Sequence, residues 1–142
     1  MGRRHRAASS VIPLSVVLVL SALGTARAGS DGTGQPTSWG SFYVSYESTP
    51  EPIPFNEVFN LIVTVRDGTD RSKPIGDCSI DVIATMPAHH HGMNLRPRVT
   101  SLGDGRFRVD GMLLHMPGRW QIQIDVNRHT VTERAVFDVP VR

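Results

Sequence analysis

The sequence predicts an all-β protein, an immunoglobulin-like antiparallel β-sandwich of about seven strands. Short runs alternate apolar and polar residues, which is the period-two pattern of a strand with one buried face. Gly, Pro, Asn and Asp separate these runs at short intervals, as turn residues do. No stretch shows a helical period. Two antiparallel sheets bury such alternating faces economically in a domain of about 100 residues.

Each run of alternating residues is taken as one strand. The runs are residues 42–46, 59–65, 78–84, 107–111, 120–126 and 135–141. Turn signals fall between them at residues 50–54, 67–76, 87–92, 102–105, 117–118 and 127–130. Asp104-Gly105 is typical of a tight hairpin turn. We therefore expect one domain over residues 39–142.

The first 28 residues are expected to be a secretory signal peptide. A basic start, with Arg3, Arg4 and Arg6, precedes an apolar run over residues 11–23 and a small-residue cleavage signal at residues 26–28. The apolar run is short for a membrane span, so an uncleaved amino-terminal anchor is the alternative. The mature protein should therefore be exported to the periplasm or the extracellular space, with no membrane span after cleavage. Residues 29–38 are rich in Gly, Ser, Thr and Pro, a composition that predicts a flexible leader.

Charge and cysteine content exclude some classes of function. The whole chain has a net charge of +2, but loss of four arginines with the signal leaves 11 basic and 13 acidic residues, a net charge of −2. The sequence offers no basic stripe for nucleic acid, so no nucleic-acid partner is expected. Cys78 is the only cysteine, so an intrachain disulfide is impossible and the hydrophobic core must stabilise the fold. Because Cys78 shares a face with Ile80 and Val82, we expect a buried small hydrophobe there.

One part of the chain has the composition of a metal site. All four methionines of the mature part and four of its five histidines lie between Met86 and Met116, mostly in the runs 86–93 and 115–118. Thioether and imidazole together suit copper, and neither carries a thiolate that an oxidising compartment would modify. The cysteine spacings and the His-Glu-x-x-His helix of common zinc sites are not recognisable here.

The predicted metal ligands are His89, His91, Met93, His115 and Met116. In an extended chain, His89 and His91 project to the same side with Cα atoms roughly 6.5 Å apart, and Met93 continues that parity. His115 or Met116 closes the site if the two loops share one end of the sandwich. As the alternative, the histidines form a hydrated polar loop and the methionines fill gaps between the sheets. Trp120 is expected to pack in the core, and His129 to be solvated in a turn.

Two motifs resemble those of the YtkA-like family and its FixH-like relatives, small exported or membrane-tethered β-sandwich proteins. One is similar to Met-Pro-x-His-x-His-Gly-Met, at residues 86–93, and the other to His-Met-Pro-Gly-x-Trp, at residues 115–120. Residues 103–109 between them are similar to the glycine-aromatic hairpin of the family, so the resemblance covers residues 55–140. It implies a β-sandwich fold, as in CopC-type copper-resistance proteins, and copper handling during oxidase assembly as in FixH relatives. His90 stands at a position that is often glycine in the family.

The sequence indicates two candidate functions. The first is an exported copper-binding protein that carries or buffers the ion and delivers it to an envelope partner such as a copper acceptor or an oxidase. The alternative is a metal-free immunoglobulin-like interaction module of the cell envelope, which presents its end loops or a strand edge to a partner protein. An enzyme is not expected, because the sequence has no nucleophile elbow, no paired carboxylates at a cleft and no Gly-rich phosphate loop. Cys78 is also poorly placed for a blue-copper site.

Overall fold

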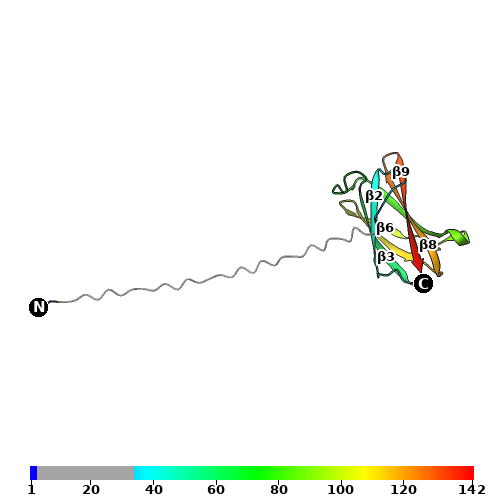
Figure 1. The fold of residues 1–142 in the computed structure, drawn as a ribbon, viewed down its shortest axis with the longest axis horizontal. Coiled ribbons are helices and arrows are strands. Elements are labelled where there is room, and N and C mark those ends of the chain that lie inside the picture. The colour runs from blue at the N-terminus through cyan, green and yellow to red at the C-terminus, as the bar shows by residue number, and fades with distance from the viewer. Residues whose placement is uncertain (3–33) are drawn as a thin grey trace.

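The computed structural model describes residues 1–2 and 34–142, and the latter form two antiparallel β-sheets packed face to face (Figure 1). The predicted signal peptide, residues 1–28, falls outside the described residues apart from its first two, as do residues 29–33. No helix in the described part of the chain is long and apolar enough to cross a membrane.

Nine strands and one short helical turn make up the fold. They are β1 (Gln35–Pro36), β2 (Phe42–Thr49), β3 (Val58–Asp67), β4 (Ser79–Met86), the 3-10 turn η2 (Pro87–His89), β5 (His91–Gly92), β6 (Arg98–Gly103), β7 (Arg106–Leu113), β8 (Gly118–Arg128) and β9 (Val131–Val141). One sheet has the order β1-β2-β3-β7-β6 and the other the order β5-β4-β8-β9. The predicted all-β class with antiparallel pairing is confirmed, and seven of the strands are six residues or longer. The immunoglobulin-like topology stays a prediction.

The core lies between the two sheets and follows the alternation seen in the sequence. In β3 the odd-numbered residues from Phe59 to Val65 are buried, and in β8 the even-numbered residues from Trp120 to Val126 are buried. Trp120 has no exposed surface, which confirms its predicted place in the core. Burying an aliphatic or aromatic side chain stabilises the fold by about 1.5–3 kcal/mol, so these alternating faces drive the two sheets together.

Strand β6 was not predicted, for a physical reason. Val99 is its only residue with even a half-buried side chain, and the other five residues are exposed. An edge strand held by backbone pairing to β7 needs no alternation of apolar side chains. The hydrophobic period was therefore absent there although the strand is present.

The sandwich begins before Trp39, because a buried carboxylate holds the preceding segment. Gln35 and Pro36 pair with β2, so residues 34–38 of the predicted flexible leader belong to the folded domain. Glu133, on β9, is 1% exposed; its Oε2 accepts hydrogen bonds from the Thr37 hydroxyl at 2.5 Å and from the backbone N–H of Ser41 at 3.2 Å. Burial by itself raises the pKa of Glu133, but the hydrogen bonds from Ser41, Thr37 and Trp39 outweigh burial and leave this pKa lowered.

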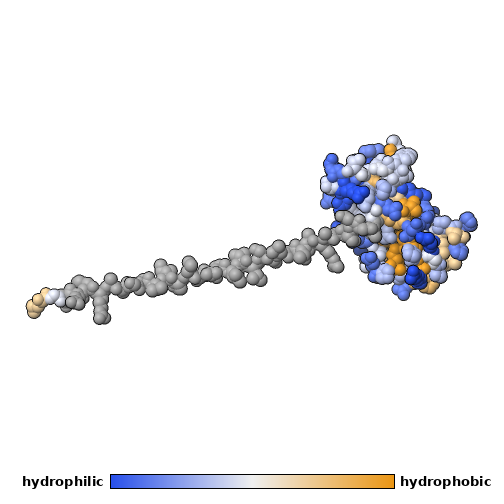
Figure 2. All heavy atoms as spheres, viewed as in Figure 1, coloured by the Kyte–Doolittle hydropathy of each residue, from blue (hydrophilic) through white to orange (hydrophobic). Residues whose placement is uncertain are grey.

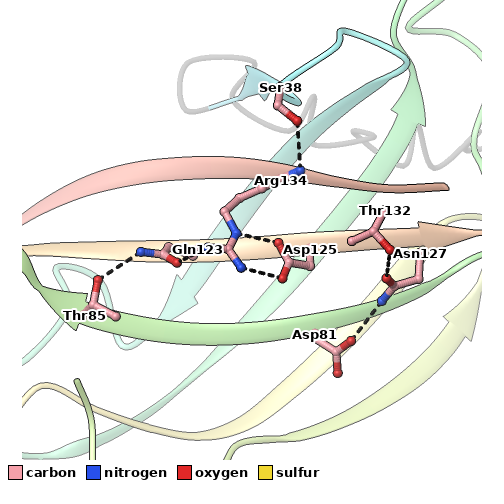
Figure 3. Close-up of polar contacts among 8 residues, drawn as sticks. All are labelled: Ser38, Asp81, Thr85, Gln123, Asp125, Asn127, Thr132 and Arg134. Carbon is pink, nitrogen blue, oxygen red and sulfur yellow. Dashed lines mark hydrogen bonds and ion pairs between the residues drawn. The ribbon is translucent and has the colours of Figure 1, made fainter. Parts of the chain in front are cut away.

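The outer face of the four-stranded sheet is a polar, solvent-facing surface. The guanidinium of Arg134 forms two hydrogen bonds with the carboxylate of Asp125, at 2.6 and 2.7 Å, and a third with Gln123 (Figure 3). Gln123 in turn donates to the Thr85 hydroxyl at 3.0 Å, which links β8 to β4. These groups therefore satisfy one another's hydrogen-bonding capacity.

Candidate functional site

The histidine run folds as a tight turn and not as the extended segment assumed from the sequence. Strand β4 ends at Met86, and the turn η2 follows immediately with Pro87 at its first position. His90 adopts a left-handed conformation with φ of 55°, and its backbone N–H bonds the carbonyl of Pro87. The chain then returns as β5, in which His91 pairs with Met86. A turn that begins with proline and contains one left-handed residue reverses the chain within a few residues. The expected alternation of side chains over residues 89–91, which assumes an extended chain, therefore does not apply.

The second loop connects β7 to β8 and is fixed by Trp120. The indole Nε1–H donates to the backbone carbonyl of Met116 at 2.8 Å. This hydrogen bond holds the loop to the buried Trp120 side chain of β8. Gly118 follows with φ of 133°, and a Cβ there would collide with the Sδ-bound methyl of Met86. The positive φ is what favours glycine here, since the Met86 methyl is the end of a flexible side chain.

The two loops meet, and their histidine rings form one cluster. The ring centroids of His91 and His115 lie 5.4 Å apart, and those of His89 and His91 lie 5.9 Å apart. The rings of His91 and His115 both meet the Trp120 indole edge to face, at 5.7 and 5.4 Å and with an interplanar angle of 71° in each case. The structure thus brings together three of the five predicted ligands, His89, His91 and His115, around a buried aromatic wall.

The two predicted methionine ligands pack against the core, and the groove that Met93 lines includes none of the clustered histidines. Met116 is half-buried against the core, and its carbonyl is bound by the indole that also touches the histidines. Met93 also packs half-buried against the core, and its backbone N–H bonds the carbonyl of Ala84 at 2.9 Å. Met93 lines a groove of about 520 Å³ beside β4, together with Leu95, Pro97 and Val99. Met86 and Met112 are buried core residues, with exposed fractions of 2% and 0%.

Two nitrogens of the cluster are buried and lack a hydrogen-bond partner. They are Nε2 of His91 and Nδ1 of His115. The Nδ1 of His91 faces the carbonyl of Gly92 at 3.4 Å, and because a carbonyl only accepts, this contact is a hydrogen bond in the tautomer that carries the proton on Nδ1. The lone pair of Nε2 is then available to a ligand. Buried polar groups are normally satisfied, so a pair of orphaned imidazole nitrogens fits a metal ion that neutral imidazoles can bind.

The side chains present limit which metal ion the cluster could hold. In the described part of the chain, no three side chains of His, Cys, Asp or Glu form a group that could hold a metal ion. A metal bound by His91 and His115 therefore requires donors of another kind, and thioethers such as those of Met93 and Met116, the predicted sulfur ligands, are soft donors that favour copper. Copper fits these residues better than zinc, whose sites are built from imidazole, thiolate and carboxylate.

Other residues singled out in the sequence lie apart from the cluster. His90 is exposed, and His129 lies in the β8–β9 turn with a side chain that is 76% exposed, 3.9 Å from a carboxylate oxygen of Asp77. Cys78 is half-buried and donates to the carbonyl of Ile75 at 3.3 Å. Burial, followed by the charge of Asp77, raises the pKa of the Cys78 thiol, which therefore stays protonated and is a poor copper ligand.

Glu133 is the buried polar residue that the sequence reasoning missed. It occupies the same parity of β9 as four buried apolar residues, Ala135, Phe137, Val139 and Val141. A carboxylate at an inward-facing position of an alternating strand is a readable signal for a buried hydrogen-bonded acid. Its role is to hold the amino-terminal segment, and it lies on the strand pair Val126–Glu133, near the opposite end of β8 from Trp120.

Fold and site together define a small β-sandwich with a histidine and methionine cluster between two end loops. The chain matches the YtkA-like family over residues 45–125, which is more than half of its length, and therefore belongs to that family. The match includes both motifs at 86–93 and 115–120, and the resemblance identified from those motifs is confirmed. Searches among curated proteins and among solved structures gave no match.

Proposed function

We propose that this protein is an exported copper-binding protein that carries or buffers the ion outside the cytoplasm. One observation carries the proposal: two loops distant in sequence place His91 and His115 with ring centroids 5.4 Å apart, each with a buried, unpartnered nitrogen. Polar groups in that state need a ligand to offset their desolvation. Copper, when bound, supplies the Lewis acid that accepts these lone pairs.

The proposed roles of the ligands follow from their exposure. His91 and His115 are half-buried and hold the ion against Trp120, whereas His89 is exposed at the outer side of the cluster and is where an ion enters or leaves. Met93 and Met116 supply the thioethers that complete the set. Exchange of the ion with an envelope partner, such as a copper acceptor or an oxidase under assembly, would then begin at His89.

The arrangement also supports holding an ion and not turning over a substrate. The site offers imidazoles and thioethers, all neutral donors, and no acidic side chain belongs to the ring cluster. Trp120 positions both histidine rings through its edge-to-face contacts and the second loop through its hydrogen bond to the Met116 carbonyl. A rigid aromatic wall of this kind holds ligands in place without taking part in chemistry.

Copper titration of matched variants tests the proposal. The untagged protein, purified from cells that export it, is assayed for bound metal and titrated with Cu(I) against a competing chelator. The His91→Ala/His115→Ala variant should lose at least about 100-fold in affinity, since loss of even a supporting group commonly costs 10–100-fold. The control is His90→Asn/His129→Asn, which also removes two histidines, both at positions with positive φ that asparagine tolerates. Equal affinity in the two double variants would contradict the proposal.

A metal-free interaction module is the second candidate, favoured by one strand edge. Strand β5 pairs only with Thr85 and Met86, so within the described residues β4 has no neighbour on that side from Ser79 to Ile83. The groove of about 520 Å³ lies along this edge, and exposed apolar side chains of Ile83 and Leu95 line it. An extended segment of a partner could add there as a strand. A specific envelope partner retained in the presence of a chelator, by a protein that binds no copper, would favour this candidate.

A further inference from the structure

The two segments that carry the clustered histidines contain no formally charged side chain. Residues 84–95 and 111–118 include both loops and contain no Asp, Glu, Lys or Arg, although these types make up 20% of the chain. The turn η2 projects from the sandwich (Figure 1), and pale and orange surface appears beside blue at that side of the molecule (Figure 2). Residues 52–56 join this region through a hydrogen bond from the backbone N–H of Asn56 to the carbonyl of Leu114 at 3.0 Å; they are likewise uncharged and expose Phe55 at 45%.

An uncharged, partly buried site discriminates between the oxidation states of copper. The desolvation cost of an ion in the Born description rises with the square of its charge, so Cu(II) loses far more hydration energy than Cu(I) on entering the same environment. Neutral imidazole and thioether donors return no charge to offset that loss. The buried nitrogens of His91 and His115 and the wall formed by Trp120 place the ion in such an environment.

Ligand preference acts in the same direction. Cu(II) prefers square-planar or tetragonal sets of nitrogen and oxygen, whereas soft thioether sulfur selects Cu(I). No carboxylate lies in either segment, and Met93 and Met116 are the soft donors proposed beside the histidines. We propose that the site is selective for Cu(I), and that absence of charge from residues 84–95 and 111–118 is the feature that makes it so. This inference rests on the proposed copper function.

The test adds one charge beside the cluster without removing a ligand. Ala88 is exposed within η2, next to His89, so Ala88→Asp places a carboxylate at the outer side of the site. Thr130→Asp is the matched control, because Thr130 is exposed in the turn beyond β8, which runs eleven residues from Gly118. That length is roughly 33 Å, several times the Debye length of about 10 Å at 0.1 M salt.

Affinities for Cu(I) and Cu(II) are measured by chelator competition in the full protein and in both variants, and the ratio of the two gives the reduction potential of bound copper. Ala88→Asp should shift the ratio toward Cu(II) by about tenfold, the effect of one unit charge about 10 Å away at an effective dielectric of about 20. A tenfold shift equals a potential lowered by about 59 mV. Thr130→Asp should leave the ratio unchanged.

The outcomes separate this inference from the proposed function. Tight Cu(I) binding with weak Cu(II) binding, and a shift confined to Ala88→Asp, supports the inference. Cu(II) binding as tight as Cu(I) binding, or an identical ratio in wild type and Ala88→Asp, overturns it while the copper function stands. Failure to bind copper in either oxidation state overturns both.

Discussion

The imidazole rings of His91 and His115 lie 5.4 Å apart although one belongs to strand β5 and the other to the β7–β8 connection. Both rings meet the same buried indole edge to face. Trp120 thus serves as a common wall for two loops, and its Nε1–H fixes the second loop through the Met116 carbonyl. The relationship ties the metal proposal to the core of the sandwich.

Trp120 should report copper binding directly. Trp39→Phe removes the other tryptophan, which is 76% exposed, and leaves Trp120 as the single emitter. Because its ring touches both imidazoles, binding of copper to His91 and His115 should change most of its emission. Fluorescence during anaerobic Cu(I) titration measures this change. The reciprocal variant Trp120→Phe keeps Trp39, whose backbone N–H donates to Glu133 near the opposite end of the sandwich, and its emission should change little. Equal responses of the two variants would contradict the placement of the site.

Glycine should be required at position 118, where β8 begins with a positive φ. Gly118→Ala combines a backbone conformation reserved for glycine with a collision against Met86, so it should lower the free energy of unfolding by about 2–4 kcal/mol. Chemical denaturation measures the loss. Gly76→Ala is the control, because a Cβ there meets only ordinary contacts, the nearest at 3.6 Å. A Gly118→Ala protein as stable as the control would contradict a requirement for glycine at this position.

The methionines should differ from one another in their effect on Cu(I). Met116→Leu keeps the volume of the side chain and removes the thioether, so Cu(I) affinity should fall by about tenfold or more while stability changes by less than about 1.5 kcal/mol. Met112→Leu makes the same change in the fully buried core and should leave affinity unaltered. Chelator competition and thermal denaturation of both variants decide the matter. If Met112→Leu weakens copper binding as much as Met116→Leu does, then the loss reflects packing and not ligation.

Glu133 should make the fold sensitive to acid. Its folded pKa is lowered, so the carboxylate contributes its full stabilisation above the ordinary pKa of about 4.3, and this contribution is lost as the pH falls through the lower folded value. Glu133→Gln should therefore cost about 1–3 kcal/mol near pH 7, and the difference from wild type should shrink below about pH 4. Unfolding followed between pH 3 and 7 tests this, with the exposed Glu47→Gln as control. A gap between wild type and Glu133→Gln that does not depend on pH would contradict the role of the ionised carboxylate.

Sequence alternation was sufficient for most of the sandwich and insufficient at its edges. Strands such as β3 and β8 bury every second residue, so their apolar residues alternate in the sequence and predict a strand. Strand β6 exposes nearly all of its side chains, so its sequence has no such alternation. The composition of the two loops indicated the candidate site, but the turn at η2 and the left-handed His90 depend on local backbone geometry that alternation does not encode. His91 and His115 meet at Trp120 because β4 pairs with β8, and this pairing joins residues far apart in the sequence.

If one copper ion binds His91 and His115 together, their ring nitrogens should respond as a pair. Long-range ¹H–¹⁵N NMR of the histidine rings during anaerobic addition of Cu(I), which is diamagnetic, resolves the individual ring nitrogens. We expect Nε2 of His91 and Nδ1 of His115, the two buried histidine nitrogens without partners, to shift together and reach one common endpoint while the ring of His129 stays unchanged. Shifts at His129 and His90 alone, with the signals of His91 and His115 unmoved at saturation, would contradict this expectation.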